Sequence, residues 1–250
     1  MADTAIIEAY CNDRLQPASF TDYAPNGLQV DCETPVQRII SGVTANLALI
    51  DAAIEAEADM LLVHHGYFWR GEEARLVGIK GRRIARLFRH NISVLAYHLP
   101  LDAHPELGNN RQLGDLLGCL EPGAEPRSNG LLWTGRLPES LDAAGLQAKL
   151  TRALGRTPLH VGNGAPAITR LAWCTGAGDR LLQSAADLGV QAFVTGEISE
   201  PAVHAARELG LHLFAAGHHA TERLGVQALG RELAREFGLQ HHFIDIDSPV

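Results

Sequence analysis

Residues 60–66 read Met-Leu-Leu-Val-His-His-Gly, an apolar run that ends in two adjacent histidines. The run is too short for a helix and lies between Asp59 and His64. A short, continuous apolar segment of this kind is typical of a buried strand in a parallel sheet. We therefore expect His64 and His65 to stand at the carboxyl end of such a strand.

Similar segments alternate with helical patterns along most of the chain. Strands are expected near 25–30, over 36–43, 60–63, 92–97, 171–175, 192–195 and 211–215, and at the terminal segment 243–246. Helices are expected over 4–15, 46–58, 179–188, 201–209 and 218–237, within 71–90, and after Asn109. This alternation predicts an α/β fold with mainly parallel strands, built as layers of sheet and helix.

The length of 250 residues is compatible with one or two domains. The stretch 121–130 contains several Pro and Gly residues and is the best candidate for a linker. It would separate an N-terminal α/β lobe, residues 1–125, from a C-terminal α/β lobe, residues 126–250.

A faint internal repeat suggests that the two lobes arose by duplication. The segments Thr44–Val63 and Thr175–Val194 have the same length and the same expected strand-helix-strand content. In each half, a later strand is followed by a histidine with a carboxylate four residues further on, as His98 with Asp102 and as His218 with Glu222. Chance similarity among such units is the alternative explanation.

Composition argues against several classes of protein. With 46% hydrophobic and 20% charged residues, the chain has an ordinary globular composition rather than a disordered one. The net charge of −8 argues against a general nucleic-acid binder. No apolar run approaches a membrane span, and no signal peptide is visible. The four cysteines are scattered without a CxxC pair, which indicates free thiols and a cytoplasmic location.

Three of the expected strands end in residue types that bind metal ions. In open α/β sheets, ligands bind beyond the carboxyl ends of the strands. Imidazole and carboxylate groups without a thiolate suit Zn, Fe, Mn, Ni or Co. The candidate ligands are His64, His65, Asp102, His218 and Glu222, with His98 as a secondary candidate.

This set of donors exceeds what one tetrahedral ion needs. Because carboxylates can bridge, two divalent ions about 3.5 Å apart with a bridging water are the simplest solution. Neither half of the chain offers enough ligands for two metals. We therefore expect the metal site in the cleft between the lobes, where ligand sites commonly form.

Other polar segments permit more than one interpretation. Glu197 follows an expected strand and is a candidate catalytic base, an acceptor that orients a metal ligand, or a solvated acid at a helix start. The basic segment from Lys80 to Arg89 is either a solvated helix face or a contact for phosphate groups. His241 and His242, before the expected terminal strand, are interpreted as structural. The absence of GxSxG, Walker A and GxGxxG motifs counts against serine hydrolase, P-loop and Rossmann proteins.

Five motifs together resemble the Nif-three-like family, whose members are often labelled GTP cyclohydrolase I type 2 homologues. The motifs occur in order along nearly the whole chain, which is most similar to the bacterial YbgI-like branch. They are Pro25-Asn-Gly-Leu-Gln-Val30, His64-His65-Gly66, His98-Leu-Pro-Leu-Asp102, Thr195-Gly-Glu197 and Gly217-His-His-Ala-Thr-Glu222.

The resemblance implies a dinuclear metal centre and a toroidal homohexamer. His64 and His65 match the paired histidines of the family, and Asp102 matches its first-half carboxylate. His218 and Glu222 match its C-terminal His-x-x-x-Glu motif. The resemblance does not imply a particular reaction.

Two functional hypotheses follow. The first is a metal-dependent hydrolase that uses a metal-bridging water on a nucleotide-like or other phosphorylated small molecule, with the cyclohydrolase label resting on resemblance alone. The second is a non-enzymatic metal-binding or regulatory protein. A catalytic centre keeps a coordination position open for water, whereas protein ligands can saturate a storage site. Neither hypothesis requires an organic cofactor, a nucleic acid or a membrane.

Overall fold

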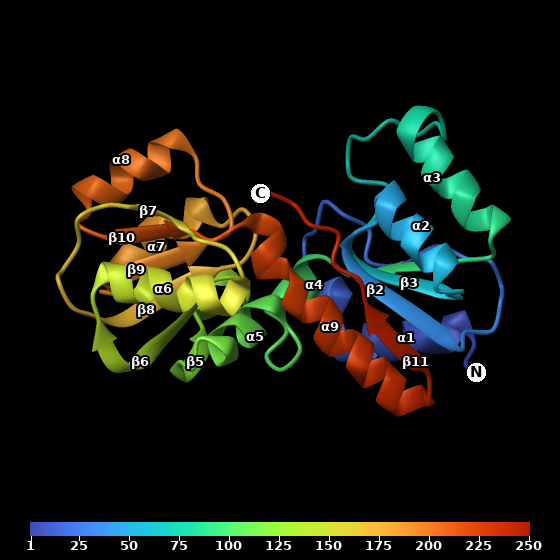
Figure 1. Ribbon diagram of the computed structural model, residues 1–250, viewed down its shortest axis with the longest axis horizontal. Helices are drawn as coiled ribbons and strands as arrows, with labels where there is room; N and C mark the ends of the chain where they lie inside the picture. Colours follow the sequence, from blue (N-terminus) through green and yellow to red (C-terminus); the bar gives the residue numbers. More distant parts are fainter. The chain divides into compact units, whose positions relative to one another are not determined.

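The computed structural model describes residues 1–250, which form two compact units. Unit 1 comprises Met1–Leu101 and Gly225–Ile246, and unit 2 comprises Asp102–Leu224 and Asp247–Val250. Each unit has one sheet with helices on both of its faces (Figure 1). The predicted α/β class, with two lobes of layered sheet and helix, is confirmed. None of the helices combines the length and the apolar character that a membrane crossing requires.

The sheet of unit 1 has the strand order β1-β4-β3-β2-β11. Its strands are β1 (Gly27–Val30), β2 (Arg38–Thr44), β3 (Met60–His65), β4 (Ser93–Ala96) and β11 (Gln240–Phe243). Its helices are α1 (Thr4–Leu15), α2 (Leu47–Glu55), α3 (Gly78–Arg89) and the later part of α9 (His218–Phe237). The short helix α4 (Leu99–Ala103) ends the first segment of the unit. All strands run parallel except β1, which is antiparallel to β4.

The sheet of unit 1 is covered on both faces. Leu61 of β3 packs in one core with Leu49 of α2 and Ile84 of α3. Leu62 points to the opposite face and is fully buried as well. This double burial explains why β3 is an unbroken apolar run in the sequence.

The sheet of unit 2 has the strand order β5-β6-β8-β9-β10-β7, in which β8, β9 and β10 are parallel and the others antiparallel to their neighbours. Its strands are β5 (Leu120–Ala124), β6 (Trp133–Leu141), β7 (Leu159–Val161), β8 (Ile168–Cys174), β9 (Ala192–Thr195) and β10 (His212–Ala215). Its helices are α5 (Asn109–Leu116), α6 (Ala143–Leu154), α7 (Leu182–Asp187), α8 (Glu200–Glu208) and the first part of α9.

The two faces of this second sheet have separate cores. On one face, Leu171 and Trp173 of β8 pack with leucines of α5 and α6. On the other face, Ala172 and Phe193 pack with side chains of α7 and α8. Because neighbouring residues of a strand point to opposite faces, β8 contributes alternate side chains to the two cores.

Four strands in each unit follow one plan. The order β1-β4-β3-β2 in unit 1 matches the order β7-β10-β9-β8 in unit 2. Each set has three parallel strands and a fourth strand that is antiparallel to the last of them. In both units the antiparallel strand comes first in the sequence and follows a helix, α1 or α6. This shared order supports the predicted duplication.

The observed elements depart from the predicted ones in several places. Residues 121–130, the expected linker, instead contain most of β5, which pairs with β6. The terminal strand covers Gln240–Phe243 rather than 243–246, and it pairs with β2 of unit 1. The compact units therefore differ from the predicted lobes 1–125 and 126–250, because each unit is built from two separate segments.

Candidate metal centre

Three histidines of unit 1 cluster at the carboxyl ends of two neighbouring strands. His64 and His65 end β3, and His98 follows β4. A ring nitrogen of each lies within 4.8 Å of a ring nitrogen of the other two. Two donors bonded to one ion at about 2.1 Å each lie roughly 3–4 Å apart, so this spacing suits a shared cation after small adjustments.

Each of these imidazoles has its Nδ1 engaged by a neighbouring oxygen atom. The Nδ1 of His64 donates to the carbonyl oxygen of Tyr97 at 2.9 Å, and the Nδ1 of His98 donates to the Asp22 carboxylate at 2.8 Å. The Nδ1 of His65 lies 3.1 Å from the hydroxyl oxygen of Thr44. Since Nδ1 is engaged in each ring, Nε2 is the nitrogen that can bind a metal.

Asp22 is held as a carboxylate by several donors. Burial alone would raise the pKa of this side chain, but hydrogen bonds from His98, Asn26 and the backbone of Ala24 outweigh burial and lower the pKa to about 2. The Asn26 side chain also accepts a hydrogen bond from the backbone nitrogen of His98 at 2.7 Å. The turn at Pro25-Asn-Gly therefore positions His98 as well as starting β1.

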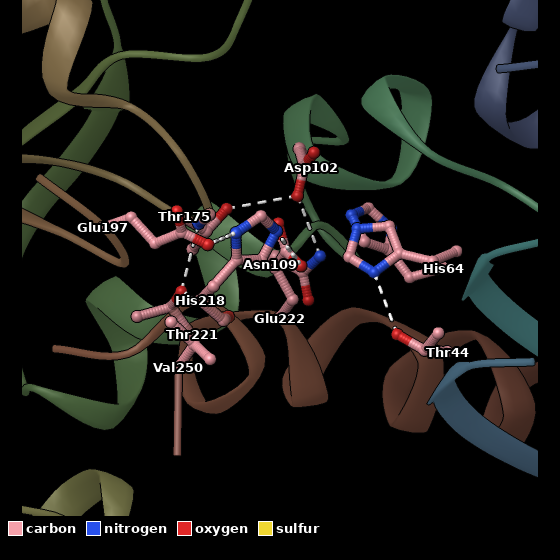
Figure 2. A network of polar contacts seen from close by, with 12 residues as sticks. Thr44, His64, Asp102, Asn109, Thr175, Glu197, His218, Thr221, Glu222 and Val250 are labelled. Carbon is pink, nitrogen blue, oxygen red and sulfur yellow. Dashed lines mark hydrogen bonds and ion pairs between the residues drawn. The ribbon is translucent and has the colours of Figure 1, made fainter. Parts of the chain in front are cut away.

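Unit 2 contributes two buried carboxylates and one imidazole (Figure 2). Nε2 of His218 lies 3.0 Å from Oε2 of Glu222, one helical turn further along α9. An Asp102 carboxylate oxygen lies within 4.8 Å of a Glu222 oxygen. Asp102 is 5% exposed and Glu222 is 2% exposed. Two carboxylates buried this closely repel each other, and a bound cation would relieve that repulsion.

Neighbouring side chains fix the orientation of these carboxylates. Oδ1 of Asp102 accepts hydrogen bonds from the Asn109 amide at 2.8 Å and from the Thr175 hydroxyl at 3.1 Å (Figure 2). Gly176 has a φ of +64°, and a Cβ built on it would lie 3.2 Å from the carboxyl carbon of Glu222. The backbone approaches Glu222 so closely that a side chain at position 176 would disturb it.

Glu197 contacts His218 directly. Its Oε1 accepts a hydrogen bond from Nδ1 of His218 at 2.5 Å, while Nε2 of the same ring faces Glu222. Burial alone would lower the pKa of His218, but Glu222 and Glu197 outweigh it and raise the pKa to about 9. In the absence of a metal, His218 is therefore a cation between two carboxylates at neutral pH.

Imidazole nitrogens and carboxylate oxygens are donors that divalent Zn, Fe, Mn, Ni and Co accept. The clustered imidazole nitrogens, the buried carboxylates and their fixed orientations all fit such an ion. The predicted residues are thus grouped as His64, His65 and His98 in unit 1 and Asp102, His218 and Glu222 in unit 2.

Two further histidines have partners outside this group. Nδ1 of His104 accepts hydrogen bonds from the backbone nitrogens of Glu106 and Leu107 at 3.2 and 3.0 Å. Nε2 of His241 lies 2.7 Å from the hydroxyl oxygen of Ser41. His241 lies in β11 itself, rather than before a strand, and its packing matches the structural role expected for it.

The cysteines form no disulfide, and burial raises the pKa of each thiol. A raised thiol pKa leaves little reactive thiolate at neutral pH. This agrees with the expected free and unreactive thiols.

The supporting residues around the site are the part that sequence patterns miss. Asp22 lies 76 positions from His98, and Thr175 lies 73 positions from Asp102. The one signal available is the pair Thr44 and Thr175, which mark equivalent strand ends in the repeat. Nothing in the sequence distinguishes Asn109 from an ordinary residue at a helix start.

Comparison with known proteins places the chain in a family. A family model described as Duf34/NIF3 (NGG1p interacting factor 3) matches residues 3–249. A relative from Allochromatium vinosum, named "GTP cyclohydrolase 1 type 2 homolog", is 53% identical over 250 residues and covers 100% of this chain and 98% of its own. A relative of the same name from Pseudomonas aeruginosa is 54% identical over 241 residues and covers 94% of each chain.

Among solved structures, one described as "protein ybgI, unknown function" matches with a TM-score of 0.95 and 46% identity. The match covers 99% of this chain and 100% of that one. These findings confirm the resemblance that the sequence motifs indicate, and the chain belongs to the Duf34/NIF3 family.

Proposed function

We propose that this protein is a metal-dependent hydrolase whose centre holds two divalent ions. The observation that carries the proposal is that four imidazoles each have Nδ1 engaged by a neighbouring group, which is a carbonyl or carboxylate oxygen for His64, His98 and His218 and the Thr44 hydroxyl for His65. Histidines that bind metals are commonly fixed in this way. The proposed ligands are His64, His65, Asp102, His218 and Glu222, with His98 as a further donor.

Neither unit alone has a complete set of ligands for two ions. Unit 1 supplies three imidazoles, and unit 2 supplies one imidazole with two buried carboxylates. We therefore propose that both sets serve one dinuclear centre of Zn, Fe, Mn, Ni or Co. The expectation from the sequence that this centre lies in a cleft between the lobes stays a prediction.

Divalent ions at such a centre would lower the pKa of coordinated water and polarise the group to be cleaved. Asn109 and Thr175 would keep the Asp102 carboxylate in one orientation through the hydrogen bonds to its Oδ1. Glu197 would hold the His218 ring through Nδ1, and proton transfer by Glu197 is a second possible role.

The substrate class is proposed from the names of the relatives, which are called GTP cyclohydrolase 1 type 2 homologs. We propose a nucleotide-like or other phosphorylated small molecule. A toroidal homohexamer and a cytoplasmic location stay predictions from resemblance and sequence.

A hydrolase screen on the metal-reconstituted protein tests the proposal, with Asp102→Ala as the blank. Elemental analysis of the same samples should approach two metals per chain. Hydrolysis that disappears in Asp102→Ala supports the enzyme. Two bound metals without hydrolysis of any phosphorylated substrate would favour a non-enzymatic metal-binding protein, and a plateau near one metal would contradict the dinuclear centre.

A further inference from the structure

Arg156 lies at the same end of the strands of unit 2 as the proposed metal ligands of that unit. It follows Gly155, the residue that caps α6, and precedes β7 by a few residues. Because β7 is antiparallel to β10, with Leu159 opposite Ala215, the start of β7 lies beside the end of β10. The chain continues from β10 through Gly217 into α9.

The Arg156 side chain packs flat against the turn that leads into α9. A Cβ built on Gly217 would lie 2.8 Å from Cδ and 2.9 Å from Cζ of Arg156. Gly217 has a φ of +100° and directly precedes His218, so the guanidinium lies one residue from a proposed metal ligand. The end of α6 is held in place because Leu154 accepts a hydrogen bond from Arg223 of α9 at 2.5 Å.

The Arg156 guanidinium has no acceptor in the protein. Its Nη1 is buried and makes no hydrogen bond, and Arg156 forms no ion pair. Arg14, another partly buried arginine, pairs with Glu232 at 2.8 Å, whereas Arg83 of α3 also has a buried Nε without a hydrogen bond. A guanidinium stays charged at every physiological pH, and a buried donor without an acceptor is unfavourable. A side chain needed only for packing on Gly217 would not require that charge.

We infer that Arg156 binds an oxyanion of the substrate, either a phosphate or a carboxylate, at this edge of the sheet. The planar guanidinium offers parallel N–H donors that match two oxygens of such a group. A cation cannot serve as a metal ligand, so Arg156 complements the carboxylates of the site instead of joining them. The inference rests on the proposed function for the location of the reacting group.

Isothermal titration calorimetry with inorganic phosphate, and separately with acetate, tests this inference on the full chain. The variants are Arg156→Gln, Arg156→Lys and the matched control Arg152→Gln, which removes an exposed charge from the same end of α6. We expect Arg156→Gln to weaken binding of the preferred anion about tenfold, Arg156→Lys to weaken it less, and Arg152→Gln to leave it unchanged. If the binding of phosphate depends on Arg156, the substrate is phosphorylated. If only the binding of acetate depends on Arg156, the substrate carries a carboxylate.

Each sample is measured as purified and after treatment with a chelator, and its metal content and melting temperature are recorded. Arg156-dependent binding that persists in chelated protein supports the inference even if the metal proposal fails. Equal affinities in Arg156→Gln and the wild type, or no saturable binding of either anion to the wild type, would overturn it. Loss of metal or of folding in both Arg156→Gln and Arg156→Lys would assign Arg156 a structural role and overturn it too.

Discussion

The two units share an arrangement of four strands, but they carry different polar side chains at the ends of these strands. Unit 1 places His64 and His65 at the end of β3, whereas unit 2 places Glu197 shortly after the equivalent strand β9. After the third parallel strand, both units place a histidine, His98 or His218. Unit 1 thus supplies imidazoles, and the buried carboxylates Asp102 and Glu222 belong to unit 2.

The two equivalent histidines, His98 and His218, differ in where the acceptor of their Nδ1 hydrogen bond lies in the chain. In both units a carboxylate accepts the Nδ1 hydrogen bond, yet Asp22 precedes β1 whereas Glu197 follows β9. The same chemistry therefore comes from non-equivalent positions of the repeat. The Asp22 side chain is 4% exposed, whereas the Glu197 side chain is 44% exposed. The histidine is therefore common to both units, whereas its acceptor comes from a different position in each.

The largest expected effect follows from removing a carboxylate of unit 2. Glu222→Gln replaces a buried anionic donor, so we expect metal affinity to fall by more than the roughly 10–100-fold typical of outer partners. If Glu222 bridges two ions, both should be lost, as measured by elemental analysis after reconstitution. Glu208→Gln, an exposed acid of α8, is the matched control. Retention of one ion would make Glu222 a ligand to a single metal.

The two acceptors can be compared directly by Asp22→Asn and Glu197→Gln. Each change removes the carboxylate that orients a histidine ring, and we expect roughly 10–100-fold weaker metal binding in each case. The effect of Asp22→Asn should be the larger one, because water can partly replace the exposed Glu197. Competition with a chelating dye measures both affinities. Equal losses would mean that burial of the acceptor does not matter.

We expect His241 to make the stability of unit 1 sensitive to acid. Burial, with Arg231 and His242 nearby, lowers the pKa of this imidazole from 6.5 to about 4. The unfolded chain then binds the proton more readily than the folded chain, so unfolding free energy should decline as pH falls from about 6.5 towards 4. Urea unfolding at several pH values, followed by the fluorescence of Trp69, the tryptophan of unit 1, measures this decline.

The His241→Gln variant provides the control for this pH dependence. It removes the titrating group while keeping a polar side chain opposite Ser41. Its stability should therefore change less between pH 7 and 5 than that of the wild type. A slope as steep as the wild type's would assign the acid sensitivity to other groups.

The sequence predicts those helices and strands whose burial produces a continuous apolar run or a regular spacing of apolar residues. The helices Thr4–Leu15 and His218–Phe237 and the strand Ala192–Thr195 coincide with their expected bounds. The strand β6 is missed because only one side of it is buried over part of its length, and β7 because it is a three-residue edge strand. Parallel strands buried on both faces are visible in a sequence, and strands that are partly exposed or very short are much less so.

The candidate ligands are proposed for the same local reason, since each histidine lies at or just after the end of an apolar strand and each carboxylate lies four residues after a histidine. Their supporting partners depend on tertiary contacts. The hydrogen bond between Asn110 and the backbone of Thr175, at 3.0 Å, joins residues 65 positions apart and has no local sequence signature. A sequence therefore predicts which side chains can bind a metal better than it predicts which residues orient them.

The smallest expected effect concerns the side chains that precede a helix in each unit. The Asn46 side chain accepts a hydrogen bond from the backbone nitrogen of Leu49 at 2.9 Å and caps α2, whereas the Ser199 side chain makes no such bond before α8. Asn46→Ala should therefore lower the unfolding free energy by about 1 kcal/mol, because a partly buried helix start loses its acceptor. Ser199→Ala should change it by less than about 0.5 kcal/mol. Urea titrations of both variants measure the difference, and equal losses would show that the Asn46 contact adds nothing to the stability of unit 1.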